Sequence, residues 1–592
     1  MDFYSFYTGQ IFDAYKWLGA HFSQDSTVFR TFAPQAQKAE LLLDGQVIPM
    51  NKIYNGQFYE IEVKDIAPGS KYEYRIYANG RYVDHCDPYG YSMELRPDHR
   101  SIVYDLSDYK FTDKDWMKKR SDMKNKPLNI YEMHAGSFRK PGEKEDDWYN
   151  YEQLGDILIP YLIENGYNYV EFLPLCEHPC DNSWGYQTTG YFSPTSRYGT
   201  PLQLKKLIDA LHKNNIGAIL DFVPVHFAVD SYGLAKYDGN ALYEYPSNDV
   251  GLSEWGSCNF MHSRGEVKSF LQSSANFWLE EYHFDGLRMD AISRIIFWQG
   301  DEHRGVNSNA VDFVKNMNRQ LKKNNPGCML IAEDSTSYRG ITASSEKGGL
   351  GFDYKWDLGW MNDTLSFFAL PPEKRQEGYH KLTFSMMYFK DENYLLPLSH
   401  DEVVHGKGTI VNKMYGSKEE KMAQAKALYM FMAAHPGKKL NFMGNELAQF
   451  REWDERRQQD FDLLNDPVHK QFHDYIRLLN RIYLDDPAFY EMDYQDAGFE
   501  WADCHQEDKQ LYAVIRRSEN STILAVFNFS NRAFTNYELD IKDAFSSADT
   551  ILYSDWQQFG GNSDPSASPV RVNGDKLLVE IAPYSSMLIS IH

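Results

Sequence analysis

The strongest constraint on the fold is a series of apolar runs of strand length, which alternate with longer helix-like stretches between residues 109 and 487. This alternation is typical of βα units, whose strands pair in parallel to form one sheet. Most runs end in polar or charged residues, which suits a (β/α)₈ TIM barrel because its strand ends gather at one face. The seven clear runs are 130–134, 169–173, 218–223, 286–290, 329–333, 394–398 and 440–444, and a weaker eighth run is 352–356.

Short runs of alternating apolar and polar residues flank this central region. Those before residue 108 are separated by Asn-Gly and Asp-Gly pairs, which are typical of hairpin turns. Similar runs return after residue 488, for example at 510–515 and 522–527. We therefore predict three domains: an N-terminal β-sandwich over 1–108, a catalytic (β/α)₈ barrel over 109–487, and a C-terminal antiparallel β-sandwich over 488–592.

The charge and the N-terminal sequence indicate which classes of partner and which cellular compartment to expect. The formal net charge is -23, and such an acidic surface repels phosphate backbones and anionic lipids, so we expect no nucleic-acid and no membrane partner. A neutral polysaccharide is not disfavoured. The N-terminus lacks a basic stretch followed by an apolar core, so we predict a cytoplasmic protein with free thiols.

One short segment is a candidate metal site. Cys176, His178 and Cys180 stand close enough together for zinc binding. No second cysteine pair completes a tetrahedral site, so we predict a surface loop there instead. We expect no metal and no cofactor.

Carboxylates mark four of the predicted strand ends, namely Asp221, Asp290, Glu333-Asp334 and Asp401-Glu402. Glycoside chemistry needs such a cluster, because one carboxylate attacks the anomeric carbon or activates water while a second protonates the leaving oxygen. For any one of these carboxylates alone, capping of the following helix is an equally good explanation.

Spacing along the strand adds a constraint on two of these groups. Arg288 and Asp290 are two residues apart, so both side chains point to the same face, and the guanidinium is expected to keep Asp290 ionised. A structural salt bridge is the alternative. Neighbouring carboxylates point to opposite faces, so at most one residue of each pair Glu333-Asp334 and Asp401-Glu402 faces a shared site, and the residues alone do not decide which.

Aromatic residues are concentrated in the loop expected after the second barrel strand, at 183–191. Flat rings stack on the apolar faces of sugars, so this loop is a candidate glucose-binding wall. Core packing is the alternative for each ring, and the better one for Tyr191. His226 and His400 are candidates for hydrogen bonds to sugar hydroxyls, although an isolated histidine is more often an ordinary buried polar residue.

These segments together resemble the α-amylase superfamily, and within it the 1,4-α-glucan (glycogen) branching enzymes. The superfamily resemblance lies in four motifs, whose order and strand placement also match: 221–226, 286–291, 332–336 and 398–403. The resemblance to branching enzymes lies in further sequence segments in and around these motifs, at 183–201, 332–336, 349–356, 400–408 and 442–446. It covers nearly the whole chain, including an N-terminal region similar to a carbohydrate-binding module.

The resemblance implies roles that spacing alone does not assign. By motif position Asp290 resembles the nucleophile, Glu333 the general acid/base and Asp401 the third carboxylate, which stabilises the distorted sugar. Arg288 supports the nucleophile. The remaining positions implied to bind substrate are Tyr186, Asp221, His226 and His400.

The implied activity is cleavage of an α-1,4-glucan and transfer of the segment to a 6-hydroxyl, by retaining double displacement. The partner is then an α-glucan (glycogen, amylose or starch), as donor and acceptor, and we expect a monomer or weak oligomer. An α-amylase-type hydrolase is the nearest alternative, because it differs only in using water to resolve the intermediate. An inactive glucan-binding protein is a second alternative, disfavoured because all three carboxylates are present.

Overall fold

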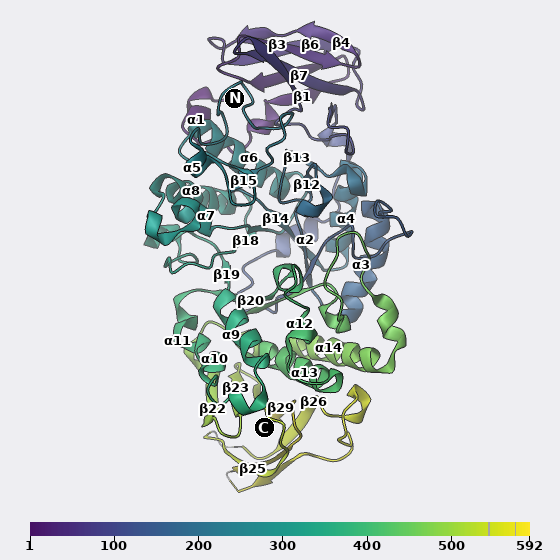
Figure 1. The fold of residues 1–592 in the computed structure, drawn as a ribbon, viewed down its shortest axis with the longest axis vertical. Helices are drawn as coiled ribbons and strands as arrows, with labels where there is room; N and C mark the ends of the chain where they lie inside the picture. Colours follow the sequence, from purple (N-terminus) through teal and green to yellow (C-terminus); the bar gives the residue numbers. More distant parts are fainter. Residues whose placement is uncertain (543–544, 575) are drawn as a thin grey trace.

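The computed structural model describes residues 1–542, 545–574 and 576–592, and it arranges three units in a row along the long axis of the molecule (Figure 1). A β-sheet unit lies at each end, and a closed parallel barrel lies between them. The predicted fold class is therefore confirmed. No helix within the described ranges is long and apolar enough to cross a membrane.

Two antiparallel sheets form the N-terminal unit. Their hairpins follow the predicted turns: between β7 and β8, Asn79 and Gly80 both have positive φ, 54° and 76°, as a tight two-residue hairpin requires. Rings from the two sheets meet between them, as Phe29 and Tyr72 do edge to face at 5.0 Å. The sheet orders are β1 (Gly19–Phe22), β2 (Ser26–Phe32), β6 (Phe58–Lys64), β5 (Asn51–Ile53), and β4 (Gln46–Pro49), β3 (Lys38–Leu43), β7 (Lys71–Ala78), β8 (Arg81–His85).

Eight parallel strands close the central barrel, in the order in which they occur in the chain. All seven predicted runs form strands, and the weaker run 352–356 contains the eighth. Helices cover the outer face of the sheet, which is why these strands are buried along their whole length. The strands are β10 (Asn129–Met133), β11 (Tyr169–Phe172), β14 (Gly217–Phe222), β17 (Gly286–Met289), β18 (Met329–Ala332), β19 (Tyr354–Trp356), β20 (Tyr394–Leu398) and β21 (Lys438–Phe442).

The helices around the barrel begin at polar caps. The Asn150 side chain accepts a hydrogen bond from the Gln153 N–H at the start of α3, and Thr200 and Gln203 start α4 in the same way. Such capping boxes determine where each strand-to-helix loop ends. The main helices are α3 (Tyr151–Asn165), α4 (Pro201–Lys213), α6 (Gly265–Glu280), α8 (Ser308–Asn324), α9 (Leu358–Phe368), α13 (Lys418–Ala434) and α14 (Pro467–Asp485).

The segment 176–180 differs from its prediction as a surface loop. Cys176 and Glu177 form the buried strand β12, which pairs with β13 (Gly190–Pro194), and only Cys180 at its end is exposed. The Arg197 guanidinium lies 2.8 Å from the Glu177 carboxylate, so an ion pair from a distant part of the chain compensates the buried charge. All six thiols are free, as predicted.

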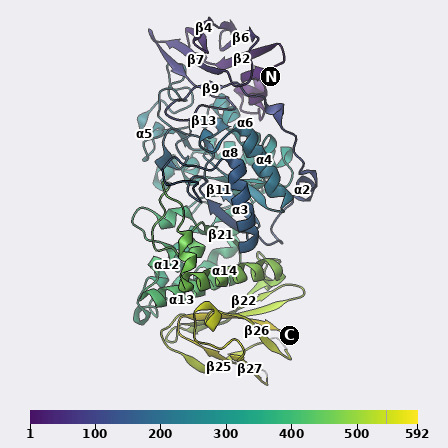
Figure 2. The same ribbon diagram turned by 90° about the vertical axis from the view of Figure 1, so that its right-hand side faces the viewer.

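The C-terminal unit consists of a five-stranded and a three-stranded antiparallel sheet, visible at one end of the turned view in Figure 2. A buried ion cluster joins it to the barrel: Asp493 contacts Lys438 of β21 at 2.9 Å and Arg516 of β23 at 2.7 Å. The sheets are β22 (Phe499–Gln506), β23 (Leu511–Arg517), β24 (Thr522–Asn528), β29 (Ser585–Ile591), β26 (Ala548–Tyr553), and β25 (Phe534–Asp540), β28 (Lys576–Ile581), β27 (Val570–Asn573).

Candidate active site

The carboxyl ends of the barrel strands bring the predicted residues to one cavity of about 370 Å³. Strand β14 carries Asp221, and Asp290 directly follows β17, while Glu333 directly follows β18. Asp401 lies in the short turn after β20. The cavity is lined by several of the predicted residues, Tyr186, His226, Asp290, Glu333, His400 and Asp401, and also by Trp184 and Trp255.

Arg288 is the centre of the charge network, and its guanidinium is buried. One terminal nitrogen, Nη1, lies 2.6 Å from Asp221 Oδ2 and 3.2 Å from Asp290 Oδ1. The other, Nη2, lies 2.8 Å from Glu333 Oε2. One guanidinium thus holds three carboxylates together, which the planar, multi-donor geometry of arginine permits.

A second chain of hydrogen bonds starts at the same guanidinium, because Arg288 Nη1 also donates to the Tyr186 hydroxyl at 3.3 Å. The Tyr186 hydroxyl donates to Asp221 Oδ2 and lies 3.3 Å from His400 Nε2. On its other side, His400 Nδ1 lies 2.5 Å from Glu132 Oε1, and the His400 backbone N–H donates to the second Glu132 oxygen. The Tyr186 and His400 rings stack with an interplanar angle of 21°, so the tyrosine ring is held at a defined angle to the cavity.

The electrostatics of Asp290 differ from the sequence prediction. Burial raises the pKa of Asp290 well above its usual range, and Glu333 raises it further, although Arg288 acts in the opposite direction. The physical reason is that Arg288 also serves Asp221 and Glu333, so its charge is shared among three carboxylates. Asp290 is therefore protonated more readily than an isolated aspartate would be.

Histidine His400 is charged at neutral pH. Burial by itself lowers the pKa of His400, but the carboxylates of Asp401 and Glu132 outweigh it and raise the pKa to about 10. The pKa of Asp401 is lowered in turn: burial opposes ionisation, and the positive charges of His400 and Arg288 outweigh it. The imidazolium is therefore available as a hydrogen-bond donor beside the cavity.

The geometry decides between the neighbouring carboxylates. Glu333 contacts Arg288, whereas Asp334 is buried and bonded to Lys355 Nζ at 2.8 Å. Asp401 lines the cavity, whereas the Glu402 carboxylate lies 3.5 Å from Lys407 outside it. His226 Nε2 lies 4.0 Å from Asp290 Oδ2. Tyr191 is buried in the core, as predicted.

Three residues near the site were not found from the sequence. Glu132 supports His400, and Glu171 stands beside Glu132 in the register of the neighbouring strand. Both acids interrupt apolar strand runs, a signal that was available in the sequence. Trp255, on a loop after β15 (His226–Phe227), had no recognisable signal, because nothing in the chain order places it beside Asp290.

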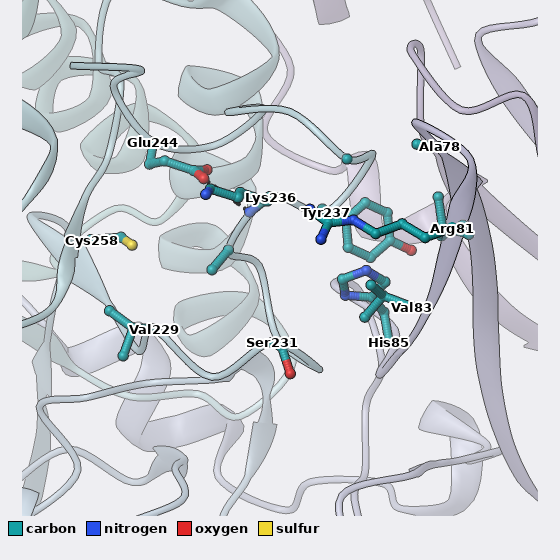
Figure 3. Close-up of a pocket in the computed structure, with 13 residues that line it drawn as sticks. Ala78, Arg81, Val83, His85, Val229, Ser231, Lys236, Tyr237, Glu244 and Cys258 are labelled. Carbon is teal, nitrogen blue, oxygen red and sulfur yellow. Dashed lines mark hydrogen bonds between the residues drawn. The ribbon is translucent and has the colours of Figure 1, made fainter. Parts of the chain in front are cut away.

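A second cavity of about 390 Å³ lies between the N-terminal sandwich and loops of the barrel unit. Figure 3 shows Arg81 of β8 reaching from the sandwich towards Tyr237, with Lys236 and Glu244 on the barrel side. None of the three acids implied to be catalytic lines this cavity. In the part of the chain that the structure describes, no group of three or more His, Cys, Asp or Glu side chains is arranged to hold a metal ion.

Sequence relatives agree with this architecture. Three family descriptions match in order: "Carbohydrate-binding module 48 (Isoamylase N-terminal domain)" at residues 17–90, "Alpha amylase, catalytic domain" at 255–533, and "Alpha amylase, C-terminal all-beta domain" at 501–592. A 1,4-alpha-glucan branching enzyme GlgB of Fusobacterium nucleatum is 43% identical, and the match covers 95% of this chain and 93% of that protein. The chain belongs to the 1,4-alpha-glucan branching enzyme family. The GlgB enzyme of Bacillus subtilis, 38% identical with 96% and 93% coverage, is a further member.

Solved structures with similar folds are more distant in sequence. A pullulanase from Paenibacillus barengoltzii, in complex with maltohexaose and alpha-cyclodextrin, is 17% identical with a TM-score of 0.74, and the match covers 97% of this chain and 95% of that one. A type I pullulanase from Bacillus subtilis in complex with maltose is 18% identical with a TM-score of 0.72, covering 97% and 85%. At these identities the likeness establishes the shared fold of this branching-enzyme family member and its distant relatives.

Proposed function

We propose that this protein cleaves α-1,4-glucan chains and transfers the cleaved segment to a 6-hydroxyl, forming α-1,6 branches. The observation that carries the proposal is the single guanidinium of Arg288 in contact with Asp221, Asp290 and Glu333. It concentrates a nucleophile and a proton donor at one sugar-sized cavity. Membership of the branching enzyme family supports transfer over hydrolysis.

The first half-reaction breaks the donor linkage. Glu333 gives its proton to the α-1,4 oxygen, and Asp290 attacks the anomeric carbon, so the C–O bond breaks and a glycosyl ester on Asp290 forms. The reducing-end portion of the donor leaves. Asp401 holds hydroxyls of the distorted sugar, and the charged His400 donates to another hydroxyl. The aromatic ring of Tyr186 provides the surface on which this sugar stacks.

The second half-reaction resolves the ester. Glu333, now ionised, accepts the proton of an acceptor 6-hydroxyl, whose oxygen attacks the anomeric carbon and displaces Asp290. The stereochemistry is retained because two inversions occur. Arg288 stabilises the carboxylate of Asp290 as it leaves. No step requires a cofactor or a metal ion.

The rest of the chain is assigned by the same proposal. Residues 1–108 form a β-sandwich that resembles a carbohydrate-binding module, residues 109–487 form the catalytic (β/α)₈ barrel, and residues 488–592 form a C-terminal β-sandwich. The partner is an α-glucan in both half-reactions. The protein acts in the cytoplasm as a monomer or weak oligomer, without nucleic-acid or membrane partners.

Amylose provides the test. The protein is incubated with linear amylose while iodine colour, reducing ends and α-1,6 signals in proton NMR are followed together. Branching predicts falling colour, new α-1,6 signal and little gain in reducing ends. Reducing ends that rise in step with colour loss, without α-1,6 signal, would establish a hydrolase instead. Asp290→Asn and Glu333→Gln are each expected to remove at least about 10³-fold of the activity.

A further inference from the structure

An exposed tryptophan stands at the mouth of the candidate active site. Trp255 lines the same cavity as Asp290 and Glu333, yet 47% of its surface is exposed. No other tryptophan among the described residues is so exposed. An exposed indole offers a flat apolar surface on which the apolar face of a sugar can stack.

A tight turn presents this ring. Ser253 Oγ accepts hydrogen bonds from the N–H groups of Trp255 and Ser257, at 3.2 and 3.1 Å, and the Ser253 N–H donates to the Ser257 carbonyl at 2.8 Å. Gly256 completes the turn with φ of 76° and open space around its Cα, a conformation that favours glycine. Trp255 is thus the projecting side chain of an ordered turn.

A cation holds one face of the ring. The Arg294 guanidinium lies 4.3 Å from the Trp255 ring centre, and it is itself paired with Glu254 and bonded to the Gln299 carbonyl at 3.1 Å. The Gln299 side chain donates to the carbonyls of residues 249 and 252, at 2.9 and 2.8 Å. The indole is therefore fixed before any ligand arrives, which lowers the entropic cost of binding.

The Trp255 ring lies beside both carboxylates: its centre is 5.3 Å from that of the His226 ring, and His226 Nε2 lies 4.0 Å from Asp290 Oδ2. Arg294 belongs to the segment after the nucleophile, where the Ala291 N–H donates to Glu333 Oε2 at 2.9 Å and the Ile292 N–H donates to the Glu333 carbonyl at 2.9 Å. The Tyr186 hydroxyl lies 3.3 Å from Nη1 of Arg288, whereas Glu333 is bonded to Nη2. In the proposed mechanism the acceptor hydroxyl must approach Glu333, so an acceptor chain passes the Trp255 side.

We propose that Trp255 forms an acceptor subsite: a glucosyl ring of the incoming chain stacks on the indole and brings its 6-hydroxyl to the glycosyl ester ahead of water. The inference rests on the proposed branching function and names the residue that decides how the intermediate is partitioned. An open, water-filled approach would favour hydrolysis, whereas a preformed aromatic surface favours a sugar.

The test separates the two half-reactions. An α-maltoheptaosyl fluoride donor forms the glycosyl ester with fluoride as leaving group, so no sugar is needed on the Glu333 side in the first step. Maltoheptaose is then added as acceptor, and transfer is compared with hydrolysis by chromatography and proton NMR. Trp255→Ala is expected to raise the acceptor concentration for half-maximal transfer about tenfold and to change acceptor-free fluoride release less than about twofold.

Matched variants make the outcome decisive. Trp255→Phe keeps an aromatic face and is expected to retain most of the transfer, and it also serves if Trp255→Ala fails to fold. Phe384→Ala removes another exposed aromatic ring, between α10 (His380–Thr383) and α11 (Ser385–Tyr388), and is expected to leave the ratio of transfer to hydrolysis unchanged. An unchanged ratio in Trp255→Ala, or loss of fluoride release alone, would overturn the subsite. A wild-type enzyme that only hydrolyses would instead refute the branching function itself.

Discussion

Glu132 does not line the candidate active site itself, but it is bonded to His400, which does. Its carboxylate accepts from the His400 backbone N–H at 2.9 Å and lies 2.5 Å from His400 Nδ1. The substitution Glu132→Gln keeps the shape and the backbone hydrogen bond and removes the charge. We expect it to lower the pKa of His400 and to destabilise the fold.

The size of the effect follows from the pKa of His400. That pKa is raised to about 10 from an ordinary value of about 6.5, and each unit corresponds to about 1.36 kcal/mol. The folded state therefore favours the imidazolium by about 5 kcal/mol, from two carboxylates, Asp401 and Glu132. Asp401 is the larger of the two charge contributions, so losing the Glu132 charge is expected to lower the pKa of His400 only part of the way and to cost about 2 kcal/mol.

The sign of the pH dependence is determined by the direction of the shift. Because the folded-state pKa of His400 is raised, its stabilisation is complete below about pH 6.5 and is lost as the pH rises towards 10. Thermal or urea unfolding is measured for both proteins from pH 6 to pH 10. The wild-type protein should be more stable at pH 6, and the difference should shrink steadily towards pH 10.

The neighbouring strand offers a matched control. Glu171 pairs in register with Glu132 and is equally buried, but both of its oxygens lack hydrogen-bond partners. Burial and the Glu132 charge raise the pKa of Glu171 well above its usual range, so it is already neutral, and Glu171→Gln should change stability by less than about 1 kcal/mol. If both variants lose equal stability, or if the Glu132→Gln difference does not shrink with pH, the charge argument is wrong.

Three further outcomes are expected elsewhere in the molecule. Asp493→Asn leaves Lys438 and Arg516 buried without a counter-charge, so the free energy of unfolding should fall by about 3–5 kcal/mol, measured by urea denaturation; an unchanged midpoint would contradict this. Tyr186→Phe keeps the stacking ring but loses the hydroxyl donated to Asp221, so kcat/KM should fall about 10- to 100-fold; a change below twofold would mean that the bond is not used. Dialysis against EDTA should leave activity unchanged, whereas a loss restored by calcium would reveal a metal site.

The order of elements was predictable because it depends on local pattern. Strand-length apolar runs identify βα units wherever they occur, and the eight barrel strands coincide with the runs in the sequence. Turn residues such as Asn79-Gly80 determine only the local backbone conformation, so the hairpins they form can also be predicted from the sequence. The segment 176–180 was predicted wrongly, because the partner that allows Glu177 to be buried, Arg197, comes from a later turn.

For the candidate site, the sequence by itself determined which strand ends carry carboxylates and that Arg288 and Asp290 share a face. Only the tertiary structure decided that Glu333 rather than Asp334 faces Arg288, that Glu132 charges His400, and that Trp255 stands at the cavity mouth. The physical reason is that these contacts join distant residues: Glu333 is 45 positions from Arg288, and Glu132 is 268 positions from His400. Strand direction and alternation are local properties, whereas the distance between two strand ends exists only once the barrel has closed.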